Sequence, residues 1–181
     1  MDVNTFKSVV LPLNRKLYAF AIRFINDTDE AKDIIQEIFI KLWNIRDELE
    51  KYNSVEALAM RMTRNLCLDK IKLKKTVPLN PMLQQQVYED NTKKEAEQEV
   101  LIAANRAKKI IEQLEDPQKS IMQLHDIQGY DYDEIAEILN MNINTIRVTL
   151  SRARKKVKEL LMNKYYNHEK TGNKISFREI L

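Results

Sequence analysis

Apolar residues along the chain recur mostly at helical spacing, and the clearest run lies between residues 31 and 44. Six of them fall at positions i, i+3, i+4, i+7, i+8 and i+11, which places them on one face of a helix. These residues are Ala31, Ile34, Ile35, Ile38, Phe39 and Leu42. Trp43 lies at the edge of that face. The pattern predicts an amphipathic helix that buries the face against neighbouring elements.

Two further helices are predicted on either side of this one. The first begins near Leu11, where Pro12 is tolerated because the N–H groups of a first turn have no partner within the helix. It ends at the polar segment Asn26–Asp29, which offers capping side chains to the next helix. The other is capped by Ser54 and runs to about Lys75. The core positions are Leu17, Phe20, Ala21 and Phe24 in the first, and Val55, Leu58, Ala59, Met62 and Leu66 in the other.

Residues 76–105 differ in character from the helices before them. Pro78 and Pro81 favour extended backbone in the residues that precede them. The rest of the stretch lacks a strong apolar stripe and holds five acids against two lysines. We predict an acidic linker in which only the last part, from about Lys93, is helical.

A second helical unit follows the linker. One helix ends before Asp116-Pro117, and another is stopped by Gly129. Asp131 and Glu134 have the spacing of a capping box, which predicts a short helix through Leu139. After a turn at residues 140–142, a long helix runs from Ile143 to about Leu161.

This short helix, tight turn and basic long helix match the helix-turn-helix arrangement. At 100° per residue, Ile146, Leu150, Ala153 and Val157 face inward. The outward positions are Asn144, Val148, Ser151, Arg152 and Lys155. Arg147 and Arg154 lie on the flanks, where phosphates are the expected contacts. DNA contact therefore explains the helix better than a solvated basic face does.

Composition favours helices and excludes most catalytic classes. With Gly 2 and Pro 4 in 181 residues, turn formers are too scarce for an all-β sandwich or a Gly-rich phosphate loop. Cys67 and the two histidines cannot form an internal disulfide or a Cys-based zinc site. No Ser-His-Asp set is present, so we expect a binding protein without catalytic residues, metal or cofactor. Without an apolar run of about 20 residues, we expect a cytoplasmic protein with no membrane insertion.

Charge is distributed unevenly along the chain. Residues 61–75 hold six basic side chains and one acid, and residues 138–158 hold six basic side chains and no acid. Two patches of this kind fit either a polyanion bound at two places or two solvated helix ends.

The first unit also carries two mixed surfaces. Ile40 lies in the middle of a polar face that includes Asp33, Gln36, Glu37 and Asn44. That mixture fits a partner helix with basic residues, although a single exposed Ile is also unremarkable. On the helix from Ser54, basic and apolar side chains are predicted opposite the core stripe, namely Met60, Arg64, Leu68 and Ile71, with Arg61 and Lys72 alongside. They fit single-stranded nucleic acid or a helix packed on two sides, and Asp69 is expected on the inward side.

Two sets of motifs occur in an order that matches a known family. Asp33–Trp43, followed by Arg64–Asp69, resembles region two of bacterial sigma factors of the extracytoplasmic-function group. Gly129–Ala136, followed by Asn144–Arg147 and Ser151–Arg154, resembles region four of the same factors. The spacing between the two sets also agrees.

The resemblance implies an all-α fold of two small helical domains, a three- to four-helix region-two bundle and a region-four helix-turn-helix, joined by a flexible linker. The expected boundaries are 1–75 for region two, 76–105 for the acidic linker, 106–162 for region four and 163–181 for a polar tail. Such a factor binds core RNA polymerase and directs it to promoter DNA. Control by an anti-sigma factor that clamps both domains is expected as well.

The resemblance also assigns roles to residues. Those expected to dock on the β′ clamp helices of polymerase are Asp33, Gln36, Glu37, Phe39, Ile40 and Trp43. Those expected at the melted minus-ten element are Asn53, Arg61, Arg64, Asn65 and Lys72. Those expected to read the minus-thirty-five duplex are Asn144, Thr145, Arg147, Val148, Ser151, Arg152 and Lys155. Region four is also expected to touch the flap of the β subunit.

Some positions depart from the family pattern. Asn144 stands where these factors usually have Gly, and Val148 and Thr149 stand where Ser or a basic residue is frequent. The basic end of region two is Lys72–Lys75 without an Arg, which suits phosphate binding better than bidentate base recognition.

Two other classes of protein stay open at this point. A helix-turn-helix regulator with an N-terminal signalling or dimerisation domain would need no partner surface of the Asp33–Trp43 kind. An interaction adaptor or a sigma-sequestering protein would leave the basic last helix unexplained.

Overall fold

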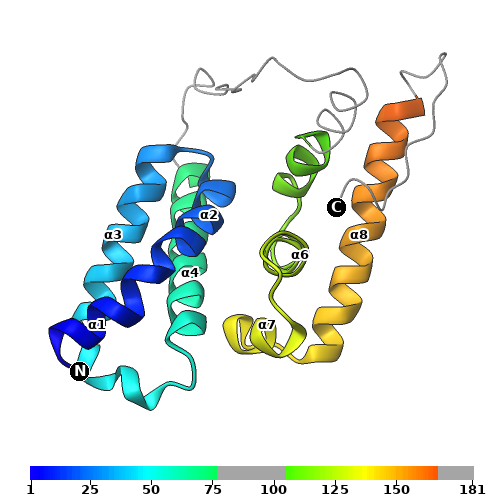
Figure 1. The fold of residues 1–181 in the computed structure, drawn as a ribbon. Helices are drawn as coiled ribbons and strands as arrows, with labels where there is room; N and C mark the ends of the chain where they lie inside the picture. The colour runs from blue at the N-terminus through cyan, green and yellow to red at the C-terminus, as the bar shows by residue number, and fades with distance from the viewer. Residues whose placement is uncertain (77–104, 167–181) are drawn as a thin grey trace, which may run out of the picture. The chain divides into compact units, whose positions relative to one another are not determined.

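The structure, a computed structural model, describes residues 1–76 and 105–166. Within these two stretches every regular element is a helix, which confirms the predicted all-α class (Figure 1). The described residues form two compact units, one of residues 1–76 with 131–142 and one of residues 105–130 with 143–166. Most of the predicted linker and the tail from residue 167 onward lie outside the described residues, and the predicted domain boundaries stay predictions.

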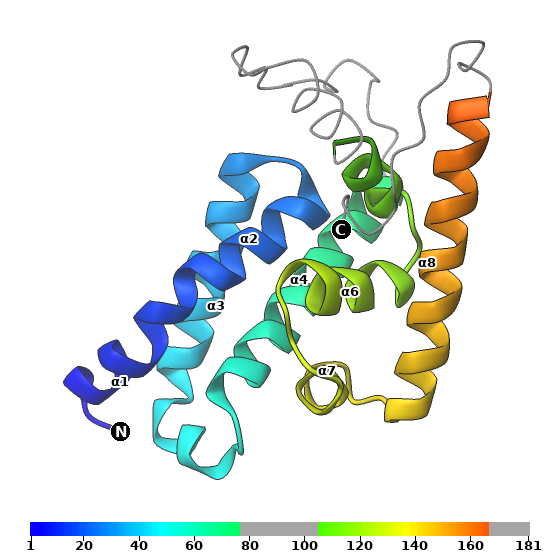
Figure 2. The same ribbon diagram turned by 45° about the vertical axis from the view of Figure 1, so that its right-hand side comes forward.

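The first unit is built around three long helices. Its residues 1–76 contain α1 (Val3–Val10), η1 (Leu11–Leu13), α2 (Asn14–Ile25), α3 (Thr28–Asn44), η2 (Arg46–Lys51) and α4 (Val55–Thr76). Helices α2, α3 and α4 pack side by side, and α1 lies at the end of the bundle where η2 connects α3 to α4 (Figures 1 and 2).

The predicted stripes of α2 and α3 form the core of this bundle. Leu17, Phe20, Ala21 and Phe24 of α2 are all buried, and Phe20 and Phe24 stack at 4.7 Å between ring centroids. On α3, five of the six predicted positions are buried and Phe39 is half-buried at the rim. The 3.6-residue spacing of apolar residues therefore predicted the core positions of α2 and α3 correctly, apart from Phe39, because each of these helices buries a single face.

Local capping sets where the helices begin. Asn26 ends α2 in the left-handed conformation with φ of 55°, and Asp27 then caps α3 by accepting from the N–H groups of Asp29 and Glu30 at 3.0 and 2.9 Å. Ser54 caps α4 as predicted, accepting from the N–H of Ala57 at 3.0 Å. These side chains satisfy donors that have no partner within the helix.

The N-terminal helix α1 was missed, and the predicted helix start near Leu11 was wrong. Pro12 lies instead in the short turn η1 between α1 and α2. Asp2 caps α1, and Phe6 and Val10 are its buried positions. A cap residue followed by apolar residues at i, i+4 spacing is the signal that would have identified this helix.

The buried face of α4 differs from the predicted stripe. Leu58 and Ala59 are buried, whereas Val55, Met62 and Leu66 are only half-buried. The other buried residues are Ala57, Met60, Thr63 and Cys67. Because α4 contacts both α2 and α3, its buried face is wider than the single stripe that the pattern predicts.

Two individual positions on α4 were therefore placed wrongly. Met60, expected on the outer face, is fully buried, and the Asp69 side chain, expected inward, is exposed, with its Oδ1 4.0 Å from Nζ of Lys72. Thr63 misleads a hydropathy pattern because it is polar but buried. Its hydroxyl donates to the carbonyl oxygen of Ala59 at 2.8 Å, which removes the cost of burying it.

The helices from residue 105 onward follow the predicted order. A helix over residues 105–112 is followed by α6 (Gln118–Met122), the π-helical turn η3 (Gln123–Ile127), α7 (Tyr132–Leu139) and α8 (Ile143–Tyr166). Gly129, with φ of +78°, lies just after η3, where the sequence predicts that the helix stops. The predicted capping box is confirmed, because the Asp131 carboxylate accepts from Glu134 N–H, and the Glu134 carboxylate from Asp131 N–H, each at 2.8 Å. Helix α8 continues to Tyr166, beyond the predicted end at Leu161.

The cap at Asp27 predicts a measurable loss of stability. Hydrogen bonding from the Glu30 N–H, with smaller contributions from Asp29 N–H and the Lys74 charge, lowers the pKa of the Asp27 carboxyl. Its stabilising effect is therefore present at neutral pH and is lost as the pH falls through the folded-state pKa. Asp27→Ala should lower the free energy of unfolding by about 1 kcal/mol, measured by urea unfolding with the fluorescence of Trp43, the single tryptophan. Asp27→Asn, which keeps the acceptor, should retain most of the stability without that pH dependence; a loss as large as that of Asp27→Ala would contradict the capping role.

Candidate functional site

The outward face of α8 is arranged as predicted. Ile146, Leu150, Ala153 and Val157 have exposed fractions of 1% or less, so they fix the rotation of the helix about its axis. Every residue predicted to read duplex DNA is exposed, namely Asn144, Thr145, Arg147, Val148, Ser151, Arg152 and Lys155. This exposed face is continuous over about three turns and combines cations, small polar groups and the apolar Val148.

The turn that leads into α8 is held by backbone geometry. Asn140 adopts the left-handed conformation with φ of 51°, which Asn tolerates better than most residues. The N–H of Met141 then donates to the carbonyl oxygen of Ala136 at 3.2 Å. These contacts end α7 abruptly and place the first residues of α8 directly after the turn.

Arg154 has a partner within the second unit that sequence reasoning missed. Its Nε donates to Oδ2 of Asp126 at 3.1 Å, and its Nη2 donates to Oδ1 of the same carboxylate. The Asp126 side chain is only 5% exposed, and Nδ1 of His125 lies 3.0 Å from Oδ1. A carboxylate so deeply buried needs a paired cation. Arg154, expected at phosphates, therefore joins α8 to η3, and no local pattern indicates the pairing because the two residues are 28 positions apart.

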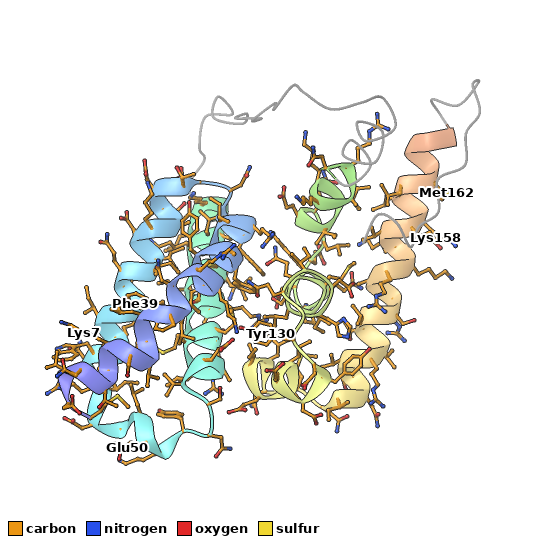
Figure 3. All side chains as sticks on the ribbon, in the orientation of Figure 1. Lys7, Phe39, Glu50, Tyr130, Lys158 and Met162 are labelled. Atoms are coloured by element: carbon orange, nitrogen blue, oxygen red, sulfur yellow. The ribbon has the colours of Figure 1, made fainter. Side chains whose placement is uncertain are left out.

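The predicted polymerase-binding face of α3 is exposed at its centre. Ile40 is 61% exposed, Asp33 and Gln36 are exposed beside it, and half-buried Glu37 pairs with Lys41 at 2.7 Å. Phe39 is half-buried on the flank of the helix (Figure 3). An exposed Ile among carboxylate and amide groups can contact an apolar residue of a partner whose rim is polar or basic.

Trp43 lies at the end of this face, but it is not an open aromatic surface. Its ring meets the Phe6 ring edge-on at 5.0 Å between centroids and 83° between planes. The Arg46 guanidinium lies over the same ring, 4.6 Å from its centroid. Trp43 is therefore packed by two other elements and is half-buried.

The basic residues of α4 and the link before it are partly brought together. Asn53 is exposed between η2 and α4, next to Tyr52, which is 40% exposed. Arg61 and Arg64 are half-buried, whereas Asn65 and Lys72 are exposed. The apolar contribution expected from Met60 is absent from this surface because Met60 is in the core. The exposed ring of Tyr52, in the turn that the resemblance placed at the minus-ten element, adds an aromatic face to this surface.

The described residues hold no group of three or more His, Cys, Asp or Glu side chains that could bind a metal ion. None of the helices within residues 1–76 and 105–166 has the length and apolarity to cross a bilayer.

Comparison with known proteins matches both units to one family. Residues 10–76 match the family model described as Sigma-70 region 2, and residues 104–157 match Sigma-70, region 4. The chain is 26% identical over 171 residues to the ECF RNA polymerase sigma factor SigW of Bacillus subtilis, covering 88% of this chain and 90% of SigW. It is 24% identical to RNA polymerase sigma-H factor of Pseudomonas aeruginosa, covering 88% of each protein.

The fold is shared with solved structures, including two complexes. The sigma factor RpoE of Bartonella quintana, in complex with the anti-sigma factor NepR, gives a TM-score of 0.67 at 24% identity and covers 88% of this chain and 98% of that one. CnrH, in complex with the cytosolic domain of CnrY, gives a TM-score of 0.64 at 19% identity over 90% of each chain.

The two arginines on α8 should behave differently when replaced. Arg154→Ala leaves the buried Asp126 carboxylate without its cation and should destabilise the second unit by about 1–3 kcal/mol. Arg152→Ala removes an exposed side chain and should change stability by less than about 0.5 kcal/mol. Amide hydrogen exchange of η3 and α8 in the full chain measures both effects. Equal protection in the two variants would show that the pair with Asp126 does not hold α8.

Proposed function

The chain belongs to the sigma-70 family of RNA polymerase sigma factors, in the extracytoplasmic-function group. From this membership we propose which partner each of its exposed surfaces binds. A sigma factor directs RNA polymerase to promoters and has no enzymatic activity of its own. The described residues offer three surfaces for that role, which are the exposed faces of α3, of α8, and of α4 with the link before it. The observation that carries the assignment most strongly is the continuous exposed face of α8 on a helix-turn-helix.

We propose that α8 enters the major groove of the minus-thirty-five element. Its inward stripe sets which side chains reach the DNA, and Arg152 lies on the outward side. An exposed Arg can donate two hydrogen bonds to O6 and N7 of guanine, which distinguishes that base from the other three. Exposed Val148 has the character needed to contact a thymine methyl group. Lys155, farther along the helix, is suited to a phosphate.

The minus-ten element is proposed to bind the link before α4 and the exposed side of α4. Capture of melted DNA requires cations for the phosphates and ring faces for unstacked bases. Asn53 and Tyr52 lie together in the link. Along α4, Asn65 and Lys72 are exposed and Arg61 and Arg64 are half-buried. Tyr52 supplies the ring that Met60 does not, because Met60 is buried.

Core RNA polymerase is proposed to dock on α3 through its β′ clamp helices. Ile40 is the most exposed apolar residue of that helix, and acidic and amide groups surround it. Docking interfaces commonly combine an apolar centre with a polar rim. We further propose that region four contacts the β flap and that the factor works in the cytoplasm with the polymerase.

An anti-sigma factor is the proposed regulator. The structure of RpoE holds the anti-sigma factor NepR, and the structure of CnrH holds the cytosolic domain of CnrY. A partner that covers the exposed faces of α3 and α8 would block polymerase and DNA together.

A single substitution tests the polymerase surface. Ile40→Glu places a charge at the centre of the α3 face and should weaken retention of core polymerase in a pull-down by more than about tenfold, because a buried unpaired charge is costly at an interface. Leu11→Glu is the matched control, since Leu11 is also an exposed apolar residue of the first unit, 51% exposed against 61% for Ile40. Equal retention of polymerase by the two variants would contradict docking on α3.

Selection from a randomised DNA library tests base reading by α8. Holoenzyme containing the wild-type factor should enrich a minus-thirty-five motif from randomised duplex DNA. Arg152→Ala should lose the preference at one position and weaken binding by about 1–3 kcal/mol, whereas Lys155→Ala should weaken all sequences equally. A uniform loss in Arg152→Ala would instead assign that side chain to a phosphate.

A further inference from the structure

Trp43 joins three elements of the first unit at one point. It is the penultimate residue of α3, Phe6 reaches it from α1, and Arg46 covers it from the first position of η2. The ring of Phe6 is itself buried, at 7% exposure. The contact therefore belongs to the packed interior of this end of the bundle.

Arg46 is attached to Trp43 in two ways. Its guanidinium lies over the indole ring, a cation–π arrangement, and its Nη1 donates to the carbonyl oxygen of Trp43 at 3.2 Å. The Arg46 guanidinium also lies 3.7 Å from the carboxylate of Asp47. Farther along η2, Leu49 is 1% exposed. The position of η2 is thus fixed at its first residue, Arg46, by Trp43, and at Leu49 by burial in the core.

The segment fixed in this way leads directly to the link before α4. Only residues 52–54 separate η2 from α4, and this link carries the exposed Tyr52 and Asn53. So short a link has little freedom, since its two ends are each held by a helix. A shift of Trp43 would therefore be transmitted to the side chains proposed to bind melted DNA.

We infer that Phe6 is a positioning residue for promoter melting: from α1 it holds Trp43 and, through Arg46, sets the path of the segment 46–53. Phe6 lies before residue 10, where the match to the region 2 family model begins, so the family match does not assign this contact. The inference rests on the proposed binding of the minus-ten element by this link.

The test compares two buried residues of the same helix. Phe6→Ala removes the ring that touches Trp43, whereas Val10→Ala removes a fully buried side chain that is not part of the Phe6–Trp43 ring pair. The fluorescence of Trp43, the single tryptophan, reports the contact directly. Phe6→Ala should raise acrylamide quenching of Trp43 and shift its emission to the red, and Val10→Ala should leave both unchanged. Phe6→Leu, which keeps an apolar side chain, replaces Phe6→Ala if that variant does not fold.

The functional readout is binding of reconstituted holoenzyme to fork-junction DNA with a randomised single-stranded segment on the non-template strand. The DNA enriched by wild-type holoenzyme then serves as the probe, with each variant at a concentration that saturates core polymerase. Phe6→Ala should bind this probe about three- to tenfold more weakly, the equivalent of one aromatic pair, while binding to fully double-stranded minus-thirty-five DNA is unchanged. Val10→Ala should match the wild type on both.

Each outcome decides between specific statements. Equal binding of the enriched probe by Phe6→Ala and wild type, with Trp43 fluorescence altered, would overturn the positioning role and leave the minus-ten proposal intact. Equal losses in Phe6→Ala and Val10→Ala would reduce Phe6 to a contribution to stability and also overturn the inference. Failure of wild-type holoenzyme to enrich any single-stranded sequence would remove the proposed minus-ten function, and the inference with it.

Discussion

Burial of one apolar stripe along each helix fixes the rotation of that helix about its axis, and the proposed binding surfaces of this protein lie opposite such stripes. On α8, the buried positions Ile146, Leu150, Ala153 and Val157 leave Arg152 and its neighbours facing outward. On α3, the buried isoleucines leave Ile40 exposed among polar groups. A polar residue introduced into either stripe would therefore change which side chains face the partner, besides weakening the core.

Capping also determines which side chains face outward. The position of the first helical residue fixes the direction in which every later side chain of that helix points. Asp27, Ser54 and the pair Asp131–Glu134 each bind free N–H groups at the start of a helix. Asn140 ends α7 with a left-handed residue immediately before the turn into α8. This protein has few glycines. Asparagine therefore adopts the left-handed conformation at helix ends where glycine is usual.

Side chains near the proposed binding surfaces divide into those that are exposed and those that hold the surface in place. Arg152 is exposed on α8, whereas Arg154, two residues later, is held by a buried carboxylate. Ile40 is exposed on α3, whereas Trp43 is packed by Phe6 and Arg46. Counting cations or aromatic residues along a helix therefore overstates the surface available for binding, since some of them stabilise the helix position instead.

The sequence by itself determined the presence and order of the α-helices from α2 onward in the described chain, the capping box, the turn and the outward face of α8, but not every helix boundary. Helical period and capping are local, so a dozen neighbouring residues are enough to reveal them. Only the tertiary structure decided the rotation of α4, the burial of Met60, the pairing of Arg154 with Asp126 and the cover over Trp43. These features depend on which helices pack together, and α4, in contact with more than one other helix, buries a face wider than its own periodicity indicates. Contacts between residues far apart along the chain cannot be predicted from hydrophobic periodicity. Within its own segment, each of the two residues looks like an ordinary surface or core residue.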